Sequence, residues 1–234
     1  MSATNPFQDA QRPRGEASWD LANDGLDLLR VAIIGSIVSS IFFKLLARGV
    51  GATAAVLEII AALIFGIVVV TALGKWRAVP PETRARGLAD MAWIGSIINL
   101  VGTAVSIVIT LMAIGGSFRS MRKLEPWIIL VAIIGLVGSV LQIVGFLLSA
   151  RATALHLDRP DIAGRATTTL VLGTISVVIG LLATLGVLGK KSGAMVGLFL
   201  LLALAIATLI VFLMTLSGLQ QAIRDRPDVS EAFT

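Results

Sequence analysis

Residues 194–219 read AMVGLFLLLALAIATLIVFLMTLSGL, a stretch without a charged side chain. An α-helix rises about 1.5 Å per residue, so about 20 apolar residues cross the roughly 30 Å hydrocarbon core of a bilayer. This stretch is long enough to do so. The sequence therefore predicts a transmembrane helix at residues 194–219.

The same pattern recurs along the rest of the chain. Of the 234 residues, 56% are hydrophobic and only 14% are charged, and the mean hydropathy is +0.94. Soluble domains carry about 25% charged residues. We therefore predict an all-α polytopic integral membrane protein, a bundle of six transmembrane helices. The five further spans are expected at about 28–47, 52–74, 90–115, 126–150 and 167–189.

The two ends of the chain are more polar than the middle. Residues 1–25 mix prolines, glycine and scattered charges, a composition that buries too little apolar surface to stay ordered alone. We expect a flexible N-terminal tail there and a short C-terminal tail at residues 223–234. Residues 26–222 form the predicted membrane domain, with hairpins at about 26–81, 82–160 and 161–222.

Short motifs suggest that these hairpins are internal repeats. A glycine followed by serine or threonine lies early in the first, third and fifth spans, at Gly35, Gly95 and Gly173. A proline–acid pair follows each even span, starting at Pro81, Pro160 and Pro227. The spacing favours three sequential two-helix repeats. The alternative is coincidence, because such strings are common in an apolar alphabet.

Basic residues indicate the orientation. If six spans place both termini on one side, most of the 19 Lys and Arg residues fall on that side, among them Arg12, Arg84, Arg151 and Arg224. The excess predicts that both termini are cytoplasmic. High glycine content and the absence of tyrosine favour a bacterial inner membrane.

Small residues recur four positions apart within the spans, as in Gly35 with Ser39 and Gly135 with Ser139. Such pairs allow close approach of helix backbones in lipid. We interpret them, with Gly95 and Gly173, as packing positions inside the bundle. The alternative is a face that joins copies of the chain in a homo-oligomer.

Glu58 is the acidic residue that lies well inside a predicted span. An unpaired carboxylate at that depth costs roughly 2.5 kcal/mol or more. Lys44 lies across the tight turn between the first two spans, so we expect a Lys44–Glu58 ion pair. The alternatives are a proton- or cation-binding site at Glu58 and an unpaired carboxylate that reaches toward the membrane surface.

Asn99 and Gln142 lie at nearly the same depth, because the third and fourth spans are antiparallel neighbours. We expect a hydrogen bond between the two amides, worth roughly 0.6–2 kcal/mol in lipid. The alternative is a polar lining shared with Ser96, Thr103, Ser106 and Ser139.

Residue inventory argues against several classes of chemistry. The chain has no cysteine and a single histidine, His156, so we expect no cofactor, metal cluster or catalytic triad. The basic residues are spread over short connectors, so we expect no nucleic-acid partner. The segment from Arg151 to Thr169 is interpreted as a charged connector, and the alternatives are a continued fourth span or a segment along anionic headgroups.

The sequence favours a non-enzymatic membrane-embedded scaffold or an accessory subunit of a larger complex. Its partners would be the lipid bilayer and another membrane protein or a second copy. The alternative is a small-solute or ion channel or transporter, in which Glu58, Asn99 and Gln142 line the path.

Overall fold

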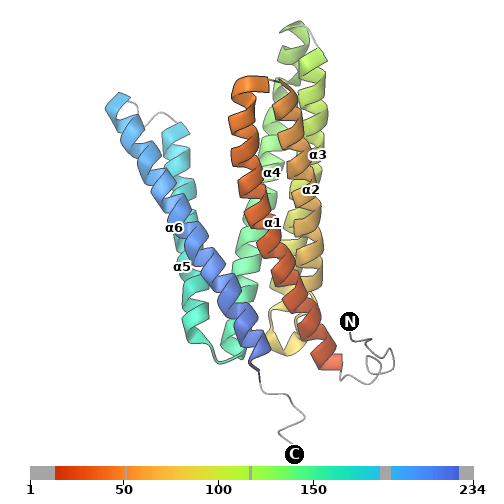
Figure 1. The fold of residues 1–234 in the computed structure, drawn as a ribbon, viewed down its shortest axis with the longest axis vertical. Coiled ribbons are helices and arrows are strands. Elements are labelled where there is room, and N and C mark those ends of the chain that lie inside the picture. Colours follow the sequence, from red (N-terminus) through yellow and green to blue (C-terminus); the bar gives the residue numbers. More distant parts are fainter. Residues whose placement is uncertain (1–13, 51, 116–117, 185–190, 227–234) are drawn as a thin grey trace, which may run out of the picture. The chain divides into compact units, whose positions relative to one another are not determined.

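The computed structural model describes residues 14–50, 52–115, 118–184 and 191–226. These residues form helices and turns, with no strand among them (Figure 1). A short 3-10 helix, η2 (Pro81–Thr83), follows the second α-helix. The α-helices are α1 (Arg14–Val50), α2 (Ala52–Trp76), α3 (Arg86–Gly115), α4 (Phe118–His156), α5 (Pro160–Thr184) and α6 (Lys191–Arg224).

Each of these α-helices is long and apolar enough to cross a membrane over part of its length. The candidate segments are Ser18–Leu46, Leu57–Trp76, Arg86–Ile109, Ile129–His156, Pro160–Ile179 and Phe199–Arg224. The chain is thus all-helical over its described residues. Six such helices are consistent with a multi-pass membrane protein.

The chain divides into two compact units, and the division falls inside α4. The first unit holds α1, α2, α3 and α4 as far as Phe146, and the second holds the rest of α4 with α5 and α6. The second unit also includes Thr83–Ala85. Compact units do not define sequence repeats, so the expected hairpins at about 26–81, 82–160 and 161–222 and their threefold repeat stay predictions.

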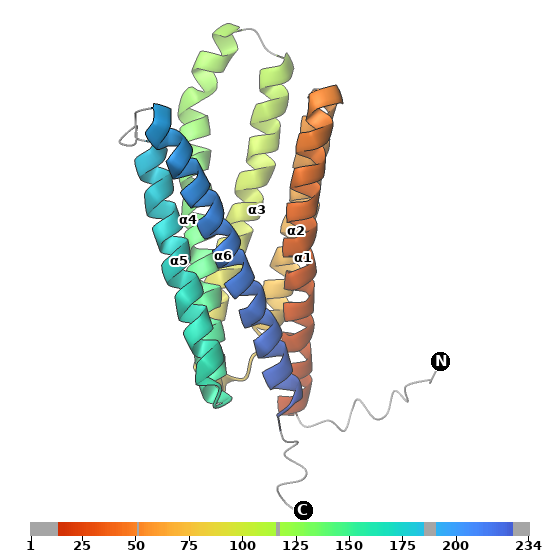
Figure 2. The same ribbon diagram turned by 60° about the vertical axis from the view of Figure 1, so that its left-hand side comes forward.

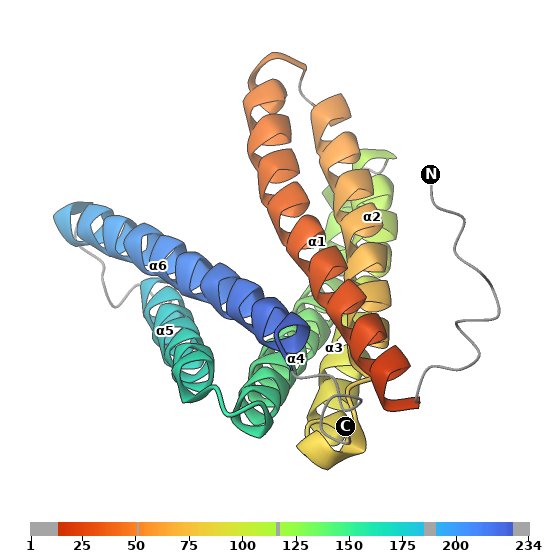
Figure 3. The same cartoon turned by 60° about the horizontal axis from the view of Figure 1, so that its bottom comes forward.

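α1 begins earlier than the sequence suggested. Residues 14–25, expected to be part of a flexible tail, are helical. Trp19 and Ala22 are buried, and α1 runs beside α2 (Figure 3). Gly25 permits the approach, since a Cβ at this position would stand 2.7 Å from the Ala72 oxygen. The sequence did not predict this buried face, because the average composition of the segment is polar. Residues 1–13 lie outside the described residues.

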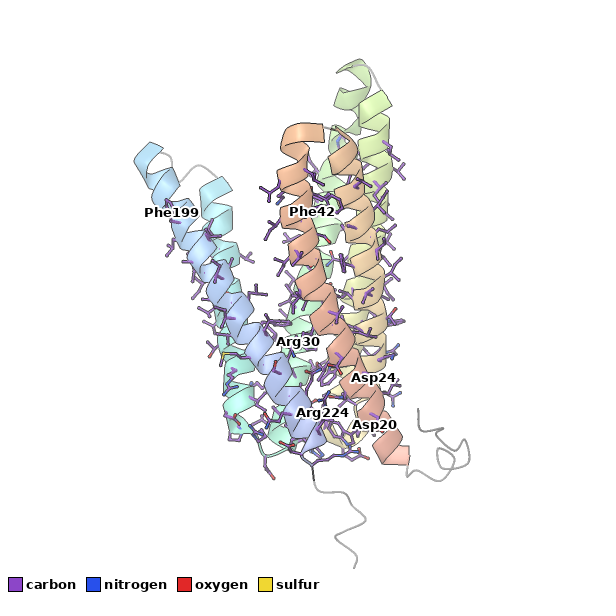
Figure 4. The ribbon with its side chains drawn as sticks, in the orientation of Figure 1. Asp20, Asp24, Arg30, Phe42, Phe199 and Arg224 are labelled. Atoms are coloured by element: carbon purple, nitrogen blue, oxygen red, sulfur yellow. The ribbon has the colours of Figure 1, made fainter. Side chains whose placement is uncertain are left out.

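The two ends of α1 differ in chemistry. Figure 4 places Asp20 and Asp24 near its first turns and Phe42 toward its opposite end. Asp24 pairs with Lys75 of α2 at 3.4 Å. Phe42 is 56% exposed, as expected of an apolar side chain that faces lipid.

α4 and α5 meet in a tight turn where we expected a charged connector. α4 continues to His156, and α5 starts at Pro160. Asp158 has a left-handed backbone with φ of 53°, and the Arg159 nitrogen donates to the Ala154 oxygen at 2.9 Å. This is a Schellman cap, which satisfies carbonyls at the end of α4.

The prolines of the predicted proline–acid pairs occupy different positions relative to the helices that follow them. Pro160 is the first residue of α5, a position that tolerates proline because its N–H would have no partner. Pro81 instead begins η2, before α3. Pro126, expected at the start of a span, lies inside α4. Pro227 lies outside the described residues.

In the second unit, α5 and α6 run side by side (Figure 2). Ile162 and Ala166 of α5 are buried, as are Leu216 and Leu219 of α6. The three- and four-residue spacings place each pair on one face of its helix. These faces form part of the apolar core of the unit.

Candidate functional site

A cluster of amide and hydroxyl groups joins α3 to α4 within the first unit. Asn99 Nδ2 donates to Gln142 Oε1 at 3.0 Å and to Ser139 Oγ at 3.0 Å. Ser139 Oγ in turn donates to Asn99 Oδ1 at 3.1 Å. The two amides that the sequence places at one depth are thus bonded to each other and to a shared serine.

Glycines allow the two helices to come this close. A Cβ at Gly138 would stand 3.0 Å from the Asn99 nitrogen, and a Cβ at Gly145 would stand 2.6 Å from the Ala92 nitrogen. Gly95 contacts the α4 backbone near Gln142 in the same way. Gly95 was predicted from the sequence as a packing position, and Gly138 was not.

Other hydroxyl groups near the cluster donate hydrogen bonds to backbone carbonyls of their own helix. Ser96 Oγ donates to the Trp93 oxygen at 2.7 Å, and Thr103 Oγ1 donates to the Asn99 oxygen at 3.0 Å. Ser106 Oγ makes the same kind of bond to the Gly102 oxygen at 2.9 Å. A hydroxyl group in a helix can satisfy its hydrogen-bonding capacity locally in this way.

Glu58 lies apart from the amide cluster, in a hollow between α1 and α2. Ser40 Oγ donates to Glu58 Oε1 at 3.1 Å. The hollow has a volume of about 320 Å³. Its walls are Ser36, Ile37, Ser39, Ser40, Glu58, Ala61, Ala62 and Phe65.

Lys44 does not provide the partner that we expected for Glu58. No ion pair joins the two side chains in the described part of the chain, where Glu58 accepts from Ser40 instead. Lys44 is exposed, one helical turn beyond Ser40. Two residues at equal depth come into contact only if each helix is rotated so that their side chains point toward each other.

The predicted packing positions fall into two groups. A Cβ at Gly35 would overlap the Phe65 ring, so Gly35 is a close contact between α1 and α2. A Cβ at Gly135 or at Gly173 would meet nothing within 4 Å. Ser39 lines the Glu58 hollow.

A second polar cluster, which we did not predict from the sequence, lies near the connector between α2 and α3. Arg77 pairs through Nε with Asp90, and its guanidinium carbon lies 4.3 Å from the Trp93 ring centroid. Trp76 packs on Phe146 with ring centroids 5.8 Å apart. Tryptophans at both span ends were a signal for this aromatic and cationic layer.

The described residues contain no group of three or more His, Asp or Glu side chains placed to hold a metal ion. No family model, curated protein or solved structure matches this chain.

Proposed function

We propose that this chain is a non-enzymatic multi-pass membrane protein that acts as a scaffold or as an accessory subunit of a larger complex. The amide cluster of Asn99, Ser139 and Gln142 is the observation that supports the proposal. Its groups bond to one another between two closely packed helices. A transport path exposes such groups to water.

The proposed location is a bacterial inner membrane with both termini in the cytoplasm. The excess of Lys and Arg on that side of the predicted spans supports it. A reporter that is active only in the cytoplasm, fused after Thr234, should be active. A reporter active only outside would contradict this orientation.

Single-cysteine accessibility tests the proposal, because the parent chain has no cysteine. Glu58, Asn99 and Gln142 are replaced one at a time and labelled in native membranes with a water-soluble thiol reagent. Glu82→Cys is the control for an exposed connector, and Val38→Cys is the control for an exposed apolar face. For a scaffold we expect N99C and Q142C to stay unlabelled until the protein is denatured.

The partner is tested by measuring the particle mass after mild solubilisation. A scaffold or subunit should be recovered in a complex heavier than its own 24.5 kDa plus the bound detergent. The complex would contain a second membrane protein or further copies of this chain. A monomer at all concentrations and in several mild detergents would contradict the proposal.

The Glu58 hollow supports a second candidate, a small-solute or ion channel or transporter. A carboxylate and three serine side chains line the same hollow. Asn99 and Gln142 do not line it, so a path through all three residues has less support than the sequence suggested. Labelling at two or more of the three cysteine positions, blocked by a candidate solute, would favour transport over the scaffold.

A further inference from the structure

A groove with one cationic end and one apolar end lies on the second unit. It has a volume of about 400 Å³. Arg165 of α5 contributes one wall. The α6 wall consists of Ile210, Leu213, Met214, Ser217, Gly218 and Gln221. These α6 positions follow three- and four-residue spacing, so they share one helix face.

The backbone of α6 lies directly beside the Arg165 side chain. A Cβ at Gly218 would stand 3.6 Å from Arg165 Nη1 and 3.3 Å from Ile162 Cγ1. The missing side chain at Gly218 therefore leaves the guanidinium room to lie against α6. It places a positive charge at the polar end of the groove, near Ser217 and Gln221.

Arg165 keeps hydrogen-bond donors for another anion. Its Nη2 is 3.9 Å from Asp161 Oδ2, which is too long for a hydrogen bond. Asp161 is instead engaged by Arg159, whose Nε and Nη2 donate to the two carboxylate oxygens at 3.1 and 3.2 Å. This pairing raises the pKa of Arg159. Among the described residues, the ion-pair contact of Arg165 is the 3.9 Å distance to Asp161.

The other end of the groove is apolar and open. Ile210 is 52% exposed and Met214 is 48% exposed, and both lie toward the centre of the α6 span. The face from Gln221 to Ile210 extends about 16 Å along the helix at 1.5 Å per residue. That length accommodates a lipid headgroup together with the first part of an acyl chain.

We propose that this groove binds an anionic phospholipid, with its phosphate on Arg165 and an acyl chain along Ile210, Leu213 and Met214. A guanidinium binds phosphate oxygens through two parallel N–H donors. A basic side chain at the membrane surface also attracts anionic lipid. The inference requires a membrane location but holds for either a scaffold or a transporter.

Native mass spectrometry of the detergent-purified full-length protein tests the proposal. The probes are phosphatidylglycerol and phosphatidylcholine, titrated separately. We expect the parent protein to retain phosphatidylglycerol more tightly than phosphatidylcholine. Arg165→Gln should weaken phosphatidylglycerol binding by about fivefold, as expected for the loss of one cation at an anionic surface.

Arg151→Gln is the matched control, because Arg151 is an exposed arginine of α4 that does not line the groove. It removes the same charge and should leave phosphatidylglycerol binding unchanged. Arg165→Lys is the second variant, which keeps the charge but loses the planar fork, and it should bind less tightly than the parent. Thermal unfolding without added lipid checks that each variant is folded.

Three results would overturn the proposal. Equal weakening by Arg151→Gln and Arg165→Gln would show a general charge effect. Equal retention of the two lipids by the parent would show an apolar groove without anion selectivity. Inorganic phosphate retained as tightly as phosphatidylglycerol in the same titration would show a phosphate site without a role for the acyl chain.

Discussion

Gly95 of α3 lies against the α4 backbone at Gln142, and this contact leaves no room for a side chain at position 95. A Cβ there would overlap the Gln142 nitrogen and stand 2.7 Å from the Gly138 oxygen. Asn99 follows Gly95 by one helical turn on the same face. The close backbone contact and the amide hydrogen bonds are therefore parts of one packing arrangement.

Substitution of Gly95 should loosen this arrangement. Gly95→Ala forces the helices apart, and we expect it to lower the free energy of unfolding by about 1–3 kcal/mol, as overpacking does in other cores. The change is measured by reversible unfolding of the protein in detergent.

Gly135→Ala is the matched control for Gly95→Ala. It changes the same atoms in α4, but its Cβ would meet nothing within 4 Å. It should be neutral or stabilising by up to about 1 kcal/mol, because alanine favours the helix over glycine. Equal destabilisation by the two variants would contradict the contact at Gly95.

A double-mutant cycle should detect the hydrogen bond between Asn99 and Gln142. We expect Asn99→Ala and Gln142→Ala to couple by about 0.6 kcal/mol, and by up to about 1.7 kcal/mol, the range found between membrane helices. The cycle is measured by the same unfolding assay. Asn99→Ala combined with Glu58→Ala is the control, which should be additive within about 0.5 kcal/mol. Additivity at 99 and 142 would show that the amide bond contributes no stability.

The sequence could predict the amide bond because depth and chemistry agree there. Asn99 and Gln142 are polar residues in apolar stretches, and antiparallel neighbours place them at equal distances from their span ends. An amide in lipid requires a partner, so few arrangements satisfy both side chains. The same reasoning predicted the six apolar helices, because span length is set by bilayer thickness.

The sequence could not predict how each helix is rotated about its own axis. Gly95 and Gly135 both look like packing glycines, yet of these two only Gly95 has a neighbouring backbone where a Cβ would stand. Lys44 and Glu58 share a depth, but Ser40 provides the contact to Glu58. The start of α1 was also missed, because Trp19 is buried among residues whose average composition is polar.

The Ser40–Glu58 bond leads to a prediction that separates it from the ion pair expected from the sequence. Ser40→Ala removes the hydroxyl that donates to the carboxylate. We expect it to lower the free energy of unfolding by about 1.5–3 kcal/mol, as loss of a hydrogen bond to a charged group does. The measurement is unfolding in detergent at pH 7.

Lys44→Gln is the control, since Lys44 is exposed and makes no ion pair with Glu58 in the described part of the chain. It should change stability by less than about 0.5 kcal/mol. Exchange of the charges, Lys44→Glu with Glu58→Lys, should then fail to restore the parent stability. A larger loss in Lys44→Gln than in Ser40→Ala would favour the ion pair.

The turn between α4 and α5 should become more stable when Asp158 is replaced by glycine. Asp158 has φ of 53°, a left-handed conformation that costs a residue with a Cβ roughly 1 kcal/mol or more. Glycine adopts it without this penalty, and Asp158→Gly also removes a negative charge from the C-terminus of a helix. We therefore expect a gain of about 1 kcal/mol, measured as a rise in the unfolding temperature in detergent.

Leu157→Gly is the control, at a neighbouring residue without positive φ, and it should instead lower that temperature. If Asp158→Gly were destabilising, the aspartate side chain would hold the turn, and the backbone conformation would not be the determining factor.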